Sequence, residues 1–118
     1  MGIAQLLRWQ WDGYSRYHRS RTNLLLHILA LPLFLCGIVA LVVALFRASV
    51  TSAVLGVLCM AASIAVQGSG HRMEENPPQP CTGPADALAR ILLEQWITFP
   101  RFLLSGDWLR ALRTAQRP

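Results

Sequence analysis

Residues 24–66 decide the fold: they read LLLHILALPLFLCGIVALVVALF, then Arg47, then ASVTSAVLGVLCMAASIAV. The first apolar run has 23 residues and the second has 19. As helices they would measure about 35 Å and about 28 Å, so each is long enough to cross the apolar core of a bilayer. Because only Arg47 separates them, the two runs predict a transmembrane helical hairpin of residues 24–46 and 48–66.

The overall composition also favours a membrane protein. Of the 118 residues, 53% are hydrophobic and only 14% are charged, which is too apolar for an ordinary soluble domain of this length. The alternative is a pair of core helices in a soluble protein, but the rest of the chain is too short to cover both on all sides. We therefore expect an all-α integral membrane protein with one membrane domain, residues 1–118.

The arginines predict the orientation of the hairpin. Those outside it lie in the segments that flank it, and the nearest to its two ends are Arg8, Arg16, Arg19, Arg21 and Arg72. Only Arg47 lies in the connection, so both termini are expected in the cytoplasm, with the hairpin in a bacterial inner membrane or the endoplasmic reticulum. The net charge of +5 is then explained by anchoring to lipid headgroups, and no nucleic acid partner is expected.

Amphipathic segments flank the hairpin on both sides. In residues 1–20, apolar and polar side chains alternate at helical spacing, which is typical of a helix that lies in the membrane interface. In residues 84–113, Pro84 is suited to open a helix, and the same kind of spacing continues toward Arg113. We expect interfacial helices in both segments, with membrane lipid as their partner.

All three histidines, His18, His27 and His71, fall at the cytoplasmic end of the predicted hairpin. Nine residues separate His18 from His27, which places them on opposite sides of a continuous helix. They converge only if the chain bends near residues 20–23. The second span is expected to unwind at residues 67–70, and antiparallel packing of the two spans could then bring His71 beside His27.

Imidazoles together with a carboxylate are the usual ligands of a non-haem ferrous ion. Glu75 is favoured over Glu74 as the carboxylate because it follows His71 by four residues. Asn23 and Gln67 are placed to hold the second nitrogen of a ligating histidine. Each histidine taken alone is also explained as a half-solvated side chain at the interface.

Two blocks of sequence resemble a known family. Tyr17-His18, then Asn23 to His27 with Pro32 downstream, and later Gln67 to Glu75 with two prolines, are similar to the yeast-type 2-hydroxy fatty acid dioxygenases. That resemblance implies a membrane-embedded Fe(II) enzyme, which uses dioxygen to shorten a 2-hydroxy long-chain fatty acid by one carbon.

The resemblance also implies residue roles. His18, His27 and His71 would bind iron, and Glu75 would be a further ligand or an acid/base group. Asn23 and Gln67 would support the ligands. Apart from the resemblance, Arg72 is expected to pair with the substrate carboxylate, with Arg19 and Arg21 as less favoured alternatives. Yeast-type members carry additional hydrophobic segments between the two blocks, and a chain with only two spans is compatible with a homo-oligomer.

The competing hypothesis is a non-catalytic membrane hairpin that binds lipid or scaffolds a partner, with its histidines free of metal. The sequence contains no glycine-rich phosphate loop, no serine nucleophile motif and no paired-cysteine zinc motif. Nucleotide-binding, serine hydrolase and zinc-finger functions are therefore not expected.

Overall fold

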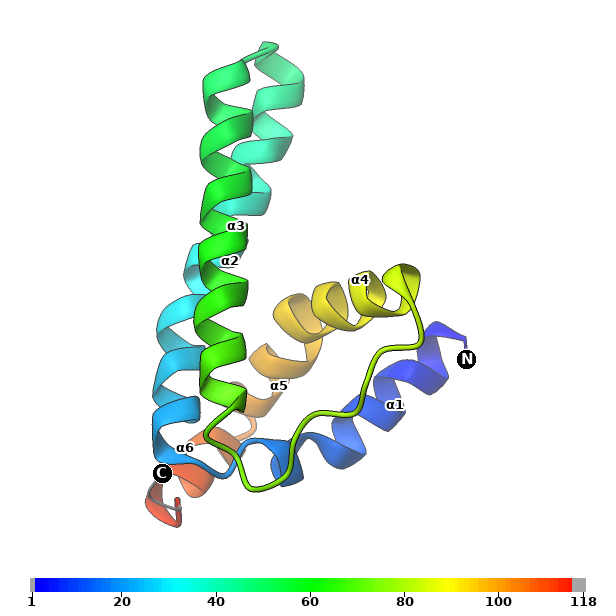
Figure 1. The fold of residues 1–118 in the computed structure, drawn as a ribbon, viewed down its shortest axis with the longest axis vertical. Coiled ribbons are helices and arrows are strands. Elements are labelled where there is room, and N and C mark those ends of the chain that lie inside the picture. Colours follow the sequence, from blue (N-terminus) through cyan, green and yellow to red (C-terminus); the bar gives the residue numbers. More distant parts are fainter. Residues whose placement is uncertain (1, 116–118) are drawn as a thin grey trace.

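The structure, a computed structural model, describes residues 2–115 and contains only helices and connecting segments in that range. The prediction of an all-α fold is confirmed. In chain order the elements are α1 (Ile3–Tyr14), the 3-10 turn η1 (Ser15–Tyr17), α2 (Arg21–Arg47), α3 (Val50–His71), α4 (Pro84–Leu93), the π-helix η2 (Glu94–Thr98), α5 (Phe99–Leu104) and α6 (Asp107–Arg113). Helices α2 and α3 form a hairpin that projects from the others, which lie beside its base (Figure 1).

Both arms of the hairpin start at a serine cap. Ser20 Oγ accepts a hydrogen bond from the Asn23 backbone N–H at 3.4 Å, and Ser49 Oγ accepts one from Ser52 at 3.1 Å. These contacts satisfy amides that have no partner inside the first turn of a helix. Between the arms, Ala48 adopts a left-handed conformation with φ 49°, which ends α2 and turns the chain back toward the base.

Two glycines let the arms of the hairpin touch. A Cβ atom added to Gly37 would lie 2.7 Å from the Gly56 carbonyl oxygen, and one added to Gly56 would lie 2.7 Å from that of Gly37. Each glycine therefore faces the backbone of the other helix. Such close approach is typical of helices that associate through small residues.

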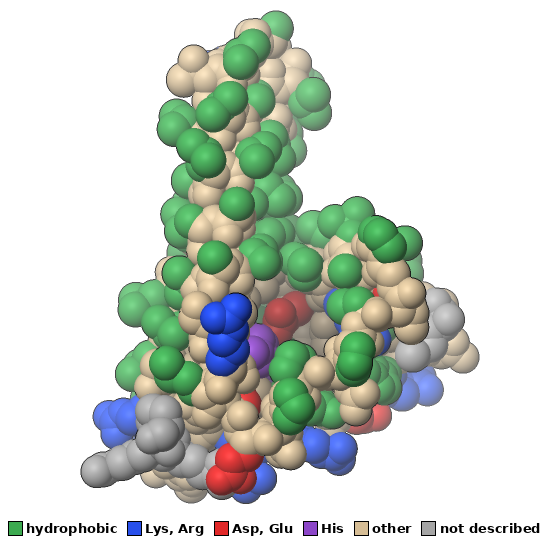
Figure 2. Space-filling model, viewed as in Figure 1, with side chains coloured by type: hydrophobic (Ala, Val, Ile, Leu, Met, Phe, Trp, Pro, Cys, Tyr) green, Lys and Arg blue, Asp and Glu red, His purple; other side chains and the backbone are tan. Residues whose placement is uncertain are grey.

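The hairpin is far more exposed than the core helices of a soluble protein. Only 28% of the most apolar window of α2 and 17% of that of α3 is buried. At the tip Leu45, Phe46 and Val50 are 84%, 87% and 77% exposed. Hydrophobic side chains cover the hairpin, whereas charged ones gather around its base (Figure 2). Both helices are thus long and apolar enough to cross a membrane, and the burial that the soluble alternative requires is absent from residues 2–115.

The flanking segments are helical, as expected, with boundaries that differ in detail. The segment predicted for residues 1–20 comprises α1 and η1, and α4 begins at Pro84 as predicted. The segment 84–113 divides into α4, η2, α5 and α6, with a break between the last two at Gly106, whose φ is 86°. Met1 and residues 116–118 of the predicted domain lie outside the described residues.

An aromatic core joins the flanking helices to the start of the hairpin. Its buried members come from α1, α2 and α5: Tyr14, Leu24, Leu31, Phe99 and Phe102. Trp108 on α6 adds a hydrogen bond, because its Nε1 donates to the carbonyl oxygen of Leu24 at 3.1 Å. The base of the hairpin is consequently fixed against α1, α5 and α6, and the candidate site lies at this junction.

Candidate metal centre

The three histidines converge at the base of the hairpin. Their ring centroids lie 4.9 Å apart for His18 and His27, 4.8 Å for His18 and His71, and 4.9 Å for His27 and His71. Residues 18–20 form no helix, and Ser20 is extended. The bend that the spacing of His18 and His27 requires is thus confirmed, slightly before the predicted place.

Helix α3 continues through the glycines near its end and thereby places His71 beside the other two histidines. The predicted unwinding at residues 67–70 is wrong, since α3 continues to His71. Gly70 has another use: a Cβ atom there would lie 2.3 Å from Asn23 Oδ1 and 3.2 Å from Asn23 Cα. The missing side chain lets α3 pack against the first turn of α2, which brings His71 to His27.

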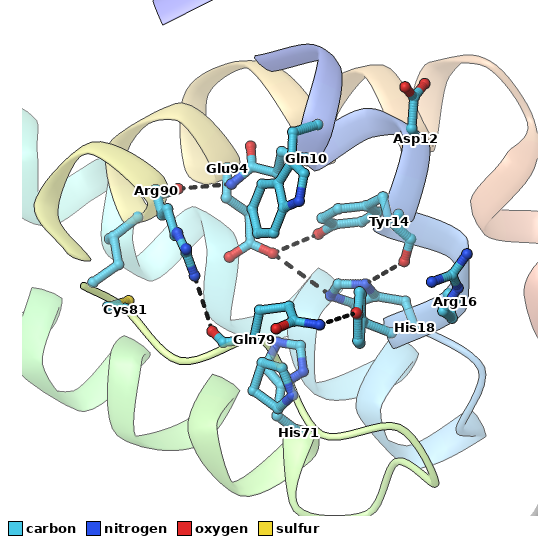
Figure 3. A pocket seen from close by; sticks show the side chains of 15 residues that line it. Gln10, Asp12, Tyr14, Arg16, His18, His71, Gln79, Cys81, Arg90 and Glu94 are labelled. Atoms are coloured by element: carbon cyan, nitrogen blue, oxygen red, sulfur yellow. Dashed lines mark hydrogen bonds and ion pairs between the residues drawn. The ribbon is translucent and has the colours of Figure 1, made fainter. Parts of the chain in front are cut away.

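Glu94 completes a group of four possible ligands. One ligand atom from each of His18, His27, His71 and Glu94 lies within 4.8 Å of all the others. Glu94 Oε2 is 3.5 Å from His18 Nε2 and 4.0 Å from His27 Nε2. The Tyr14 hydroxyl donates to the same oxygen at 2.9 Å and orients the carboxylate toward the histidines (Figure 3).

The imidazoles are oriented as metal ligands are. His18 Nδ1 lies 2.7 Å from the Tyr14 carbonyl oxygen, and His27 Nδ1 lies 3.0 Å from that of Asn23. A carbonyl oxygen accepts only, so each Nδ1 carries a proton and, in the neutral ring, each Nε2 presents a lone pair.

Each of the three imidazoles has a buried nitrogen without a hydrogen-bond partner in residues 2–115. His18 Nε2, His27 Nε2 and His71 Nδ1 are buried and accept no hydrogen bond from any described residue. Buried polar atoms are rarely left unpaired, because desolvation without a partner is costly. Three such nitrogens beside a carboxylate fit a bound cation, so this group could hold a metal ion.

The electrostatics favour an ionised carboxylate beside a neutral phenol. Burial alone would raise the pKa of Glu94, but the facing imidazoles lower it to about 2, His18 above all, because in the form that carries a second proton they stabilise the carboxylate. Burial and the neighbouring Glu94 carboxylate raise the pKa of Tyr14 well above its ordinary value. At neutral pH Glu94 therefore offers a negative oxygen, and Tyr14 keeps the proton that it donates to it.

The π-helix η2 presents Glu94 and ties it to the hairpin. Gln95 is fully buried and forms a reciprocal amide pair with Gln67, with N–O distances of 2.7 and 2.9 Å. Gln67 Nε2 also donates to Ser63 Oγ at 3.0 Å, and Ser63 in turn donates to the Ala30 carbonyl. π-Helical turns are frequent at functional sites, and here a polar chain links the turn to both arms of the hairpin.

Two of the predicted site residues lie away from this group. Glu75 and Arg72 are both exposed, and neither belongs to the four ligand groups. The physical reason is that α3 ends at His71, so the helical offset that favoured Glu75 does not exist. Glu94 occupies the carboxylate position instead.

The predicted supporting residues act in ways that their spacing did not show. Asn23 holds His27 through its backbone carbonyl, while its side-chain Nδ2 donates to Glu74 at 2.7 Å. Glu74 also accepts from the backbone N–H groups of Arg19 and Ser20, which makes it an anionic cap for α2. Gln67 contacts Gln95 rather than a histidine.

Sequence reasoning missed Glu94, although one signal was available. It is the only charge in the run Ile91 to Phe99, and Gln95 follows it directly. Two polar side chains inside an apolar stretch require partners. That pattern pointed to a buried polar contact, though not to the histidines.

No protein-family model, curated protein or solved structure matches this chain.

Proposed function

We propose that this protein is a membrane-embedded, Fe(II)-dependent dioxygenase that shortens 2-hydroxy fatty acids by one carbon. The observation that carries the proposal is the convergence of His18, His27, His71 and Glu94, with one ligand atom of each within 4.8 Å of the others. Each of the three imidazoles also has a buried nitrogen without a hydrogen-bond partner in the described part of the chain. Three buried nitrogens of this kind favour a bound metal over a scaffold that binds none. The resemblance to yeast-type 2-hydroxy fatty acid dioxygenases supports the choice of reaction.

The ligand chemistry suits iron. Neutral imidazoles with one carboxylate are typical of non-haem ferrous sites in which open positions receive substrate and dioxygen. Fe(II) bound here would supply the activation of dioxygen. A cavity of about 460 Å³ is lined by His18, His71 and Glu94 among others, so a ligand in that cavity would reach the metal-binding group.

The residues of the chain have distinct tasks in this proposal. His18, His27, His71 and Glu94 hold the ion. The backbone carbonyl of Tyr14 fixes the ring of His18, in the bend before α2, and that of Asn23 fixes the ring of His27, on α2. Such supporting contacts strengthen metal binding. The Tyr14 hydroxyl holds Glu94 in place and leaves it ionised.

The reaction balances without a further reductant. A 2-hydroxy acid and one dioxygen yield the acid one carbon shorter, carbon dioxide and water, as the bond between C1 and C2 breaks. The substrate loses four electrons and dioxygen accepts four. An enzyme of this kind therefore needs access of the acid and of dioxygen to the metal and a path for protons, and it needs no separate electron donor.

A membrane location explains where such a substrate would come from. Hydrophobic side chains extend from the hairpin over the upper edge of α4, while charged ones lie lower (Figure 2). Leu88, Trp96 and Ile97 are each 45 to 59% exposed, as expected for helices in the headgroup layer. With α2 and α3 across the membrane and the arginine-rich base in the cytoplasm, the metal group lies at the depth of a fatty acid headgroup.

Metal analysis tests the first half of the proposal. The protein is purified in detergent without chelator, reconstituted anaerobically with Fe(II), and its iron content is compared with that of His27→Ala and Glu94→Gln. We expect about one iron per chain and a large loss in both variants. Glu75→Gln is the matched control and should keep its iron. Absence of iron from the parent protein would overturn the proposal in favour of a non-catalytic hairpin.

Product analysis tests the second half. The iron-loaded protein is incubated in air with 2-hydroxy acids of several chain lengths, and the products are measured by mass spectrometry. A product one carbon shorter, formed by the parent and lost in Glu94→Gln, is expected. If iron binds but every chain length remains intact, the reaction is refuted and the metal site stands.

A further inference from the structure

One arginine lines the same cavity as the metal-binding group. The wall of the cavity includes His18, His71 and Glu94, and it also includes Arg90 on α4, one helical turn before Glu94. Residues four apart on a helix lie on the same face. Arg90 and Glu94 therefore both face this cavity, from neighbouring levels of one helix surface (Figure 3).

The guanidinium of Arg90 is held in place. It stacks over the ring of Trp9 with 4.6 Å from Cζ to the ring centroid, and its Nη1 donates to the Gln79 carbonyl at 2.9 Å. Its Nη2 lies 3.1 Å from Asp86 Oδ2. Only 16% of the side chain is exposed, so this arginine does not sample many conformations in water.

One nitrogen of this fixed guanidinium has no acceptor. Arg90 Nε is buried and makes no hydrogen bond with any described residue. A buried N–H on a charged group strongly favours an acceptor oxygen. Arginine binds carboxylates through paired N–H groups in a planar fork, and Nε with the remaining hydrogens of the terminal nitrogens offers such donors.

We propose that Arg90 is the residue that binds the carboxylate of the fatty acid substrate and turns its reacting end toward the metal-binding group. This inference rests on the proposed function and deepens it, because it makes the acid headgroup the recognised feature. It also replaces Arg72, which is exposed and does not line the cavity. Arg16 lines the cavity as well but is exposed, so water already solvates its charge.

Recognition through Arg90 predicts selection for acids over alcohols. A site with a buried polar donor rejects an analogue that leaves the donor unpaired. The matched pair of probes is 2-hydroxyhexadecanoate and hexadecane-1,2-diol, which share the chain and the 2-hydroxyl and differ only in the carboxylate. Binding of both, tritium-labelled, is measured by scintillation proximity on the iron-loaded protein under anaerobic conditions, so that no turnover occurs.

The variant Arg90→Gln should weaken binding of the acid by about ten- to a hundredfold, the range of a charge-assisted hydrogen bond. Binding of the diol should change less than about twofold. Arg72→Gln is the matched control and should bind both probes like the parent. Arg90→Lys, which keeps the charge but lacks the fork, should fall between parent and Arg90→Gln.

A second variant, which should strengthen binding of the acid, tests the proposal if Arg90→Gln fails to fold. Asp86→Asn removes the anion that pairs with Arg90 and should tighten acid binding, by about two- to fivefold, without an effect on the diol. Equal acid binding by parent and Arg90→Gln, or loss of acid and diol together in a variant that keeps its iron, would overturn the assignment of Arg90. If the parent binds neither iron nor acid, the proposed function itself fails.

Discussion

Replacement of Gly70 by alanine should loosen the junction that delivers His71. The added Cβ atom would lie 2.3 Å from Asn23 Oδ1, whereas ordinary contact begins near 3.4 Å. One side must therefore move by about 1 Å. Asn23 yields poorly, because its Nδ2 is bonded to Glu74 and its Cα lies 3.2 Å from the same point. Overpacking of this kind costs about 1 to 3 kcal/mol.

The displacement should also reach the metal group, since His71 follows Gly70 directly. A shift of about 1 Å is enough to misalign a ligand, and we expect metal affinity to fall by about 10- to 100-fold, as for loss of a supporting contact. Thermal unfolding in detergent, followed by circular dichroism, measures the first effect. Competition with a chromogenic chelator measures the second.

Gly68→Ala is the matched control for this experiment. Gly68 is exposed on the same helix, and an added Cβ there meets nothing within 4 Å. Both substitutions gain helix propensity of up to about 1 kcal/mol, so the difference between them isolates the steric effect. Equal stability and equal metal affinity of the two variants would refute the close packing of α3 on Asn23.

Three further predictions concern the polar contacts around the centre. Gln67→Ala should lower the free energy of unfolding by about 1 to 3 kcal/mol, because it leaves the buried Gln95 Oε1 without its donor. Replacement of both glutamines by leucine should cost less stability than the sum of the two single changes, as a double-mutant cycle in chemical denaturation would show. Glu74→Ala should cost about 1 to 3 kcal/mol through loss of the α2 cap, while Glu75→Ala stays within about 0.5 kcal/mol of the parent in the same unfolding assay. Removal of the metal by chelator should lower the unfolding temperature, since binding at one hundred times Kd adds about 2.7 kcal/mol, and the temperature for Glu94→Gln should not respond to chelator.

The hairpin and the meeting of the histidines were predictable from sequence for a simple reason. Two apolar runs that are each long enough to cross a membrane, joined by a single residue, determine two helices, their lengths and their antiparallel arrangement together. Because both ends of such a hairpin return to one level, His27 and His71 had to lie near each other. His18 followed from the same argument once a bend was required.

The carboxylate was not predictable because its position depends on packing between distant segments. The spacing of His71 and Glu75 assumed a helix that continues, but the helix ends at His71. Glu94 reaches the site from α4 and η2, which follow a loop of twelve residues from the end of α3. The interfacial setting of the flanking helices stays a prediction.

The π-helix at Glu94–Thr98 makes the site sensitive to deletion of a residue within this turn. The Phe99 N–H bonds to the Glu94 carbonyl, so this turn holds one residue more than an α-helical turn. Deletion of one residue within it would restore an α-helical turn and rotate all that precedes it, Arg90 and Glu94 included, relative to Phe99 and Phe102 in the core. The extra residue therefore determines how the residues that face the ligands are rotated about the helix axis relative to those that pack in the core.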